Sequence, residues 1–80
     1  MEKSIFNKEL GSFIRSKRAQ INWSQSRLAS ELGNNSQNIS RIERGELSPT
    51  LFWITKLAKA FGQSLAEFIV EFDEFCSEMD

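Results

Sequence analysis

The sequence predicts a single domain built only from α-helices. Its 80 residues are a suitable length for one domain. Alternating apolar and polar runs and clusters of β-branched residues are absent, so nothing in the chain indicates β-strands. The interruptions are Gly, Asn, Ser and a single Pro, which mark turns between helices. Repeats, linkers and low-complexity segments are also absent, so we expect residues 1–80 to form one domain of five helices.

The first helix is expected over about Asn7–Gln20. Apolar side chains recur there at spacings of three and four residues, which places them on one helix face. Basic residues follow in the last turns, where cations interact favourably with the helix dipole. The apolar residues are Phe6, Leu10, Phe13 and Ile14, and the basic residues are Arg15, Lys17 and Arg18.

Two short helices joined by a tight turn are predicted next. Ser24 is a good N-cap for the first of them. Gly33 is suited to end that helix in a left-handed conformation. The following helix is expected from an Asn35 cap to about Arg44. Only two of its residues are apolar, so it needs support from neighbouring helices to be stable.

The last two helices have clear start and stop signals. The fourth is expected over about Thr50–Phe61 and ends at Gly62. The fifth is expected over about residues 64–79, because Ser64 and Glu67 form a capping-box pair. The inward face of the fourth helix is expected to contain Leu51, Ile54, Leu57, Ala58 and Phe61.

The net charge of −1 hides a segregation of charge along the chain. Residues 1–66 contain all ten Lys and Arg and five acidic residues, which gives +5. Residues 67–80 contain six acidic residues and no basic one, which gives −6. A basic body with an acidic end is compatible with one face that meets phosphate and with an ordinary solvated acidic helix.

The residue inventory argues against catalysis. The chain has no His and no Tyr, so His-dependent triads and Cys/His zinc sites are excluded. The only cysteine, Cys76, has no second cysteine to pair with in the chain, which fits a cytoplasmic protein. We find no segment typical of a signal peptide or a membrane span. We therefore expect no enzymatic activity, no metal and no cofactor.

Four segments together resemble the Cro/C1-type (lambda-repressor-like, XRE) helix-turn-helix domain. They are RSKRAQ, WSQSRLASELG, ISRIERGELSPTL and LAKAFGQSLAEF, and the resemblance covers about residues 8–69. It implies a lambda-repressor-like bundle of five helices, in which the second and third form the helix-turn-helix. The third helix is then expected to enter the major groove of double-stranded DNA.

The resemblance also implies roles for particular residues. Gln25 is expected to contact phosphate and to buttress the third helix, and Arg44 falls at a phosphate-contacting position. Arg27 stands where family members usually have Glu, and we expect it to attract phosphate. The residues expected to touch bases or the adjacent backbone are Ser36, Gln37, Asn38, Ser40 and Arg41. The alternative for Ser36, Gln37 and Asn38 is a solvated helix start with good capping residues.

Two further positions have structural meaning in the family. Arg18 and Glu43 occupy positions that often form an ion pair between the first and third helices, and we expect this pair here. Glu46 and Leu47 depart from the family, because the loop that contains them is often basic.

The fifth helix is a candidate interface. Its apolar residues recur at spacings of three and four and extend past what a four-helix body should cover. We expect a two-fold homodimer, and the alternative is that this helix folds back over its own core. The expected interface residues are Phe52, Trp53, Phe68, Phe72, Phe75, Cys76 and Met79.

These expectations support two functions. The first is a sequence-specific transcriptional regulator, similar in size to restriction–modification controller proteins, that binds a palindromic operator as a homodimer. The alternative is the antitoxin of a toxin–antitoxin pair, whose C-terminal helix holds a partner protein while DNA binding serves autoregulation.

Overall fold

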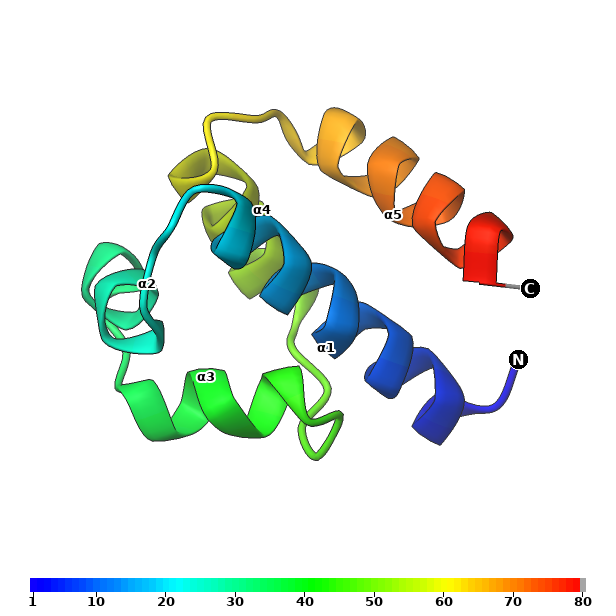
Figure 1. The fold of residues 1–80 in the computed structure, drawn as a ribbon, viewed down its shortest axis with the longest axis horizontal. Coiled ribbons are helices and arrows are strands. Elements are labelled where there is room, and N and C mark those ends of the chain that lie inside the picture. Colours follow the sequence, from blue (N-terminus) through cyan, green and yellow to red (C-terminus); the bar gives the residue numbers. More distant parts are fainter. Residues whose placement is uncertain (80) are drawn as a thin grey trace.

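The computed structural model describes residues 1–79, with Met79 described by its backbone alone. These residues form five α-helices and no β-strand (Figure 1), as the sequence predicts. The helices are α1 (Lys3–Gln20), α2 (Gln25–Leu32), α3 (Ser36–Glu43), α4 (Leu51–Ala60) and α5 (Leu65–Met79). None of the described helices is long and apolar enough to cross a membrane.

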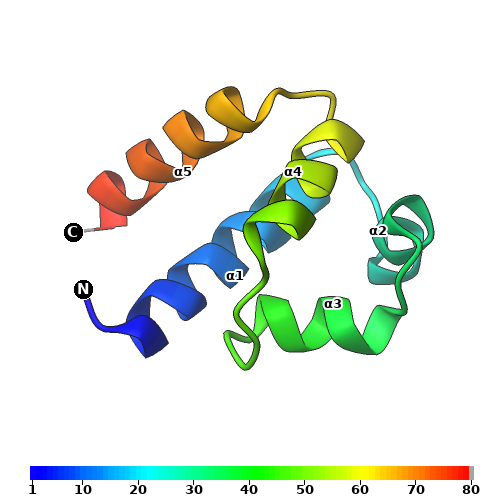
Figure 2. The same ribbon diagram turned by 180° about the vertical axis from the view of Figure 1, so that it is seen from behind.

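The long helix α1 is the centre of the arrangement. In Figures 1 and 2, α3 and α5 lie on opposite sides of α1, and α2 lies at the end of α1 that leads into it. Helix α5 runs back along α1, so its last turns come near the start of α1. The result is that α3 forms one edge of the molecule, away from the acidic helix α5.

Polar caps fix where the helices begin. Ser24 Oγ accepts a hydrogen bond of 3.0 Å from the Arg27 amide, and Asn35 Oδ1 accepts one of 2.8 Å from the Asn38 amide. The expected stop at Gly33 is confirmed by its left-handed φ of 64°. The predicted capping box at the start of α5 is also present, since Ser64 and Glu67 exchange both hydrogen bonds.

The core takes apolar side chains from every helix. Phe13 lies at its centre, because its ring is 5.2–5.5 Å from the rings of Phe68, Phe72 and Phe75 on α5. Aromatic pairs in such tilted arrangements stabilise a core beyond the area that they bury. The buried residues are Leu10, Phe13, Ile14, Leu28, Ala29, Leu32, Ile39, Ile42, Ile54, Leu57, Ala58, Phe68 and Phe72.

Two sequence predictions about helix positions were wrong in detail. Helix α1 begins at Lys3, about one turn before the expected Asn7. The extra turn is stabilised from α5, since Phe6 packs edge-to-face on Phe72 with centroids 5.5 Å apart. Leu51 has the right spacing for the core face of α4 but is 67% exposed, so that face begins at Ile54.

Helices α1 and α3 approach each other at backbone distance. A Cβ atom added to Gly11 would overlap the carbonyl oxygens of Ile42 and Glu43 at the end of α3. Glycine therefore sets the separation of these helices, and a larger residue would push α3 away from α1.

Gly11→Ala should lower the melting temperature, although Gly→Ala within an ordinary exposed helix stabilises by up to about 1 kcal/mol. The expected loss is about 1–3 kcal/mol, because an added methyl in a packed contact forces backbone shifts. Thermal unfolding followed by circular dichroism measures it, with Ser12→Ala at the neighbouring exposed position as the control. A melting temperature above that of the unmodified chain would contradict the close contact.

Candidate nucleic-acid interface

The turn between α2 and α3 is held by its own side chains. Asn34 Oδ1 accepts hydrogen bonds from the Asn35 amide at 2.8 Å and from Asn38 Nδ2 at 2.9 Å. The left-handed Gly33 precedes them, and its amide donates to the carbonyl of Ser30. Helix α3 therefore leaves α2 at a fixed angle, as a helix-turn-helix requires.

Helix α3 has two distinct faces. Ile39, Ile42 and Glu43 are buried against the other helices. Gln37 and Arg41 lie on the opposite face and are exposed, with Arg44 at the end of the helix beside them. The outer face is therefore polar and cationic, and it lies at the edge of the molecule (Figure 1).

A buried ion pair joins α1 to α3, as the sequence resemblance implied. Arg18 Nε donates to Glu43 Oε2 at 2.7 Å, and Arg18 Nη2 donates to Glu43 Oε1 at 3.0 Å. The Glu43 side chain is only 3% exposed and that of Arg18 is 14% exposed. The third guanidinium nitrogen donates to the carbonyl of Trp23 at 2.8 Å. The hydrogen bonds to Glu43 raise the pKa of Arg18, so its guanidinium stays charged.

Gln25 extends this pair to α2. Its Nε2 donates to Glu43 Oε1 at 3.0 Å, so the first residue of α2 supports the last residue of α3. The buttressing that was expected of Gln25 is present. We refer below to Arg18, Gln25 and Glu43 as the brace.

A polar hollow of about 260 Å³ lies beside the brace. Its lining comes from three helices and includes three arginines against a single carboxylate, which is the one already paired with Arg18. The lining residues are Arg15, Arg18, Gln25, Ser40, Glu43 and Arg44. A cationic hollow of this kind favours an anion such as a phosphate group.

Arg15 also belongs to this surface, although it was not among the residues expected to contact DNA. Arg15 is exposed and forms no ion pair or hydrogen bond within the described part of the chain. Its position three residues before Arg18 puts both on one side of α1. That spacing can be read from the sequence, but only the structure shows that Arg15 lines the hollow beside α3.

Two other expected residues have local partners. The Arg27 guanidinium lies 4.7 Å from the centre of the Trp23 ring, and its Nε donates to Glu31 at 3.0 Å. The Asn38 side chain donates to Asn34 Oδ1. Both are thus engaged in supporting α2 or the turn, whereas Gln37 is exposed and Arg41 has only a distant partner among the described residues, the Glu46 carboxylate at 4.0 Å.

Residues 14–68 match the helix-turn-helix family HTH_3. The chain belongs to this family. The matched region extends from the middle of α1 to the first turn of α5 and contains the whole of α2, α3 and α4. Membership supports a DNA-binding transcriptional regulator. The chain matches none of the curated proteins.

Solved structures share the fold of this helix-turn-helix protein. The restriction-modification controller protein C.AhdI from Aeromonas hydrophila is 28% identical with a TM-score of 0.75, and the similarity covers 80% of this chain and 97% of that chain. An HTH_3 family transcriptional regulator from Vibrio cholerae is 24% identical with a TM-score of 0.77, over 88% of this chain and 39% of that chain. The present chain thus spans well under half of that regulator.

The same fold also occurs within an enzyme. The hydroxypropylphosphonic acid epoxidase from S. wedmorenis is 24% identical with a TM-score of 0.69, over 78% of this chain and 33% of that chain. Likeness of fold alone therefore does not decide function. The side chains around α3 are what distinguish a DNA-binding protein from other proteins with this fold.

The expected interface residues of this helix-turn-helix protein differ widely in their exposure. Phe68 and Phe72 are buried in the core of the single chain, because α1 covers them, so they offer no exposed surface to a second chain. Phe75, Cys76 and Trp53 are partly buried against the same core. Phe52 is 75% exposed, and the side chain of Met79 lies outside the described part of the structure.

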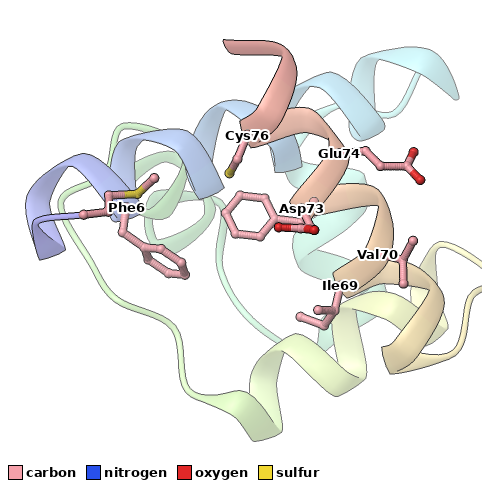
Figure 3. Close-up of a pocket in the computed structure, with 8 residues that line it drawn as sticks. Phe6, Ile69, Val70, Asp73, Glu74 and Cys76 are labelled. Carbon is pink, nitrogen blue, oxygen red and sulfur yellow. The ribbon is translucent and has the colours of Figure 1, made fainter. Parts of the chain in front are cut away.

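An apolar groove of about 570 Å³ separates the start of α1 from α5 (Figure 3). Phe6 on α1 and Ile69 on α5 lie on opposite sides of it, and Val70 is also exposed there. Asp73 and Glu74 place two carboxylates along the α5 side. The exposed apolar surface of α5 therefore lies at Ile69 and Val70, about one turn before the expected Phe72 and Phe75.

Glu43→Ala should destabilise the protein by about 3–5 kcal/mol, because it leaves the Arg18 guanidinium largely buried without its counter-charge. Urea unfolding at neutral pH measures the loss. Glu31→Ala is the matched control: it removes a carboxylate whose ion pair with Arg27 is exposed, and should cost less than about 1 kcal/mol. Equal losses in the two variants would contradict the structural role of the brace.

Proposed function

We propose that the protein is a sequence-specific transcriptional regulator that binds a palindromic operator as a homodimer. One observation carries this proposal: the outer face of α3 is exposed, polar and cationic, while its inner face is fixed by the buried brace. A helix held in this way can enter the major groove and keep its side chains at fixed heights against the base edges.

Gln37 and Arg41 are the best candidates for base recognition. Both are exposed on the outer face of α3, one helical turn apart. A Gln amide can bridge N6 and N7 of adenine, and an Arg guanidinium can bind O6 and N7 of guanine. Ser36, Asn38 and Ser40 flank this pair, where they can contact bases or the nearby backbone.

The hollow beside the brace is proposed to receive the DNA backbone. Arg15 and Arg44 line its rim, and Gln25 and Ser40 add hydrogen-bonding groups. Contacts of this kind position a protein on DNA and supply affinity that depends strongly on salt. Arg27 lies on α2 with its charge exposed and adds to the same positive field.

A homodimer would supply the specificity that a single α3 cannot. An eight-residue recognition helix reaches only a few base pairs, and two copies one DNA turn apart, about 34 Å, would double the site. The groove between α1 and α5 is the candidate interface, with Ile69, Val70 and Phe6 as its exposed apolar residues. The neighbour C.AhdI is a restriction-modification controller protein whose chain is matched over 97% of its length, which supports a small regulator of this kind.

The antitoxin alternative draws on the acidic side of the same groove. Asp73 and Glu74 lie along apolar surface and would suit an amphipathic partner that carries basic residues. Its genetic signature is a toxin gene beside the gene for this chain, whereas a restriction or methylase gene there supports the controller function.

Arg41→Ala and Gln37→Ala should each reduce the preference for the operator while leaving most sequence-independent affinity. Each bidentate base contact contributes about 1–3 kcal/mol of discrimination, which is roughly 5- to 150-fold in the dissociation constant. Mobility shifts on the protein's own promoter and on unrelated DNA, at several salt concentrations, measure the operator preference and the sequence-independent affinity. Lys59→Ala, an exposed cation at the far end of α4, is the control and should leave the preference intact. Salt-independent binding, or none, on every fragment would refute the proposed function.

Ile69→Glu and Val70→Glu should convert a dimer into a folded monomer with weaker operator binding, because each places a charge in the apolar groove. Sedimentation at micromolar concentration measures the mass, and circular dichroism checks the fold. Ala66→Glu adds the same charge at an exposed position earlier on α5 and serves as the control. A monomeric unmodified protein would contradict the homodimer.

A further inference from the structure

An acidic residue stands among the cations of the proposed DNA-binding face. Glu46 follows α3 in the turn toward α4, and its carboxylate lies beside Arg44 and Arg41. An acid at this place opposes the attraction of phosphate, so its contacts matter for the proposed function.

The backbone of the turn fixes where Glu46 lies. Its amide donates to the carbonyl of Arg41 at 2.9 Å, and the Gly45 amide donates to the carbonyl of Ile42 at 3.0 Å. These two bonds form a Schellman motif, with Gly45 in the left-handed conformation at a φ of 78°. A Cβ on Gly45 would also collide with Lys8 on α1, so the turn is packed from behind. The backbone of Glu46 is therefore held at the end of α3, within reach of Arg44.

Both carboxylate oxygens of Glu46 accept hydrogen bonds from Arg44. Arg44 Nε donates to Oε2 at 2.7 Å, and Nη2 donates to Oε1 at 3.3 Å. The remaining nitrogen, Nη1, donates to Ser40 Oγ. Arg41 Nε lies 4.0 Å from the same Oε1. All three guanidinium nitrogens of Arg44 thus have partners within the chain.

The charges of this cluster support one another. The hydrogen bond from Arg44 holds the pKa of the Glu46 carboxyl below its usual value and raises the pKa of Arg44. Both side chains remain at least half exposed, so solvent and other ions can reach them. The Glu46 carboxylate is accordingly ionised at neutral pH, and another anion can replace it as the partner of Arg44.

We propose that the Glu46 carboxylate occupies the place of a DNA phosphate on Arg44 in the free protein and so weakens sequence-independent DNA binding. A guanidinium binds carboxylate and phosphate with the same two-pronged geometry, so one group replaces the other without moving Arg44 far. Any DNA that uses Arg44 must first displace Glu46 and then lies beside its uncompensated charge. The inference rests on the proposed DNA-binding function and adds to it a residue that sets phosphate affinity.

Glu46→Gln should bind a short duplex of random sequence roughly two- to five-fold more tightly than the unmodified chain, the range of an exposed ion pair. The plot of log affinity against log salt should steepen by up to roughly 0.9, the value for one more phosphate neutralised. Fluorescence anisotropy across a salt series measures both quantities. Glu67→Gln is the matched control, because it removes the same charge from the start of α5 while an amide can still cap that helix.

A double-mutant cycle separates the direct contact from a general charge effect. In an Arg44→Ala background, Glu46→Gln should lose most of its effect, since only the more distant Arg41 remains beside Glu46. An equal gain in both backgrounds, or equal gains for Glu46→Gln and Glu67→Gln, would overturn the inference. If the unmodified chain shows no salt-dependent DNA binding, the proposed function fails. If the unmodified chain binds DNA but Glu46→Gln binds no more tightly, the proposed function stands and only the inference about Glu46 fails.

Discussion

The geometry of the DNA-binding face depends on one buried carboxylate. Glu43 is the only charged residue among the described ones that is buried, and its desolvation is offset by Arg18 from α1 and Gln25 from α2. Its own backbone carbonyl lies against Gly11, so side chain and main chain fix α3 to α1 at the same point. Three helices therefore meet at a single residue, the last one of α3.

These contacts at Glu43 explain how so short and polar a helix remains ordered. Helix α3 has eight residues and buries only Ile39 and Ile42 as apolar side chains. An isolated helix of this length would not be stable in water. Because the brace and the Asn34–Asn38 contact hold its two ends, its outer residues need no structural role. Gln37 and Arg41 are left available for recognition, and Arg44 and Glu46 can exchange partners at its end.

Much of this arrangement could be predicted from the sequence. Caps and stops are local signals, so Ser24, Gly33 and Asn35 indicated the helix-turn-helix directly. The Arg18–Glu43 pair followed from the family resemblance, because residues 25 apart carry no local signal of contact. The sequence did not reveal the first turn of α1 or the burial of Phe72. Both result from the contact between Phe6 and Phe72, which are far apart in the sequence. Arg15 and the Glu46 contact likewise required the relative placement of α1, α3 and the turn.

The most direct measurement is the location of DNA contacts along the chain. Titration of ¹⁵N-labelled protein with its own promoter fragment reports each backbone amide separately. We expect the largest shift changes at Gln25 and over residues 36–46, with smaller ones at Arg15. The brace should keep the amides of buried Ile14 and Leu57 nearly unchanged, because α3 binds without moving relative to the core. Changes concentrated on α5 and Phe6, with α3 unaffected, would contradict recognition by α3.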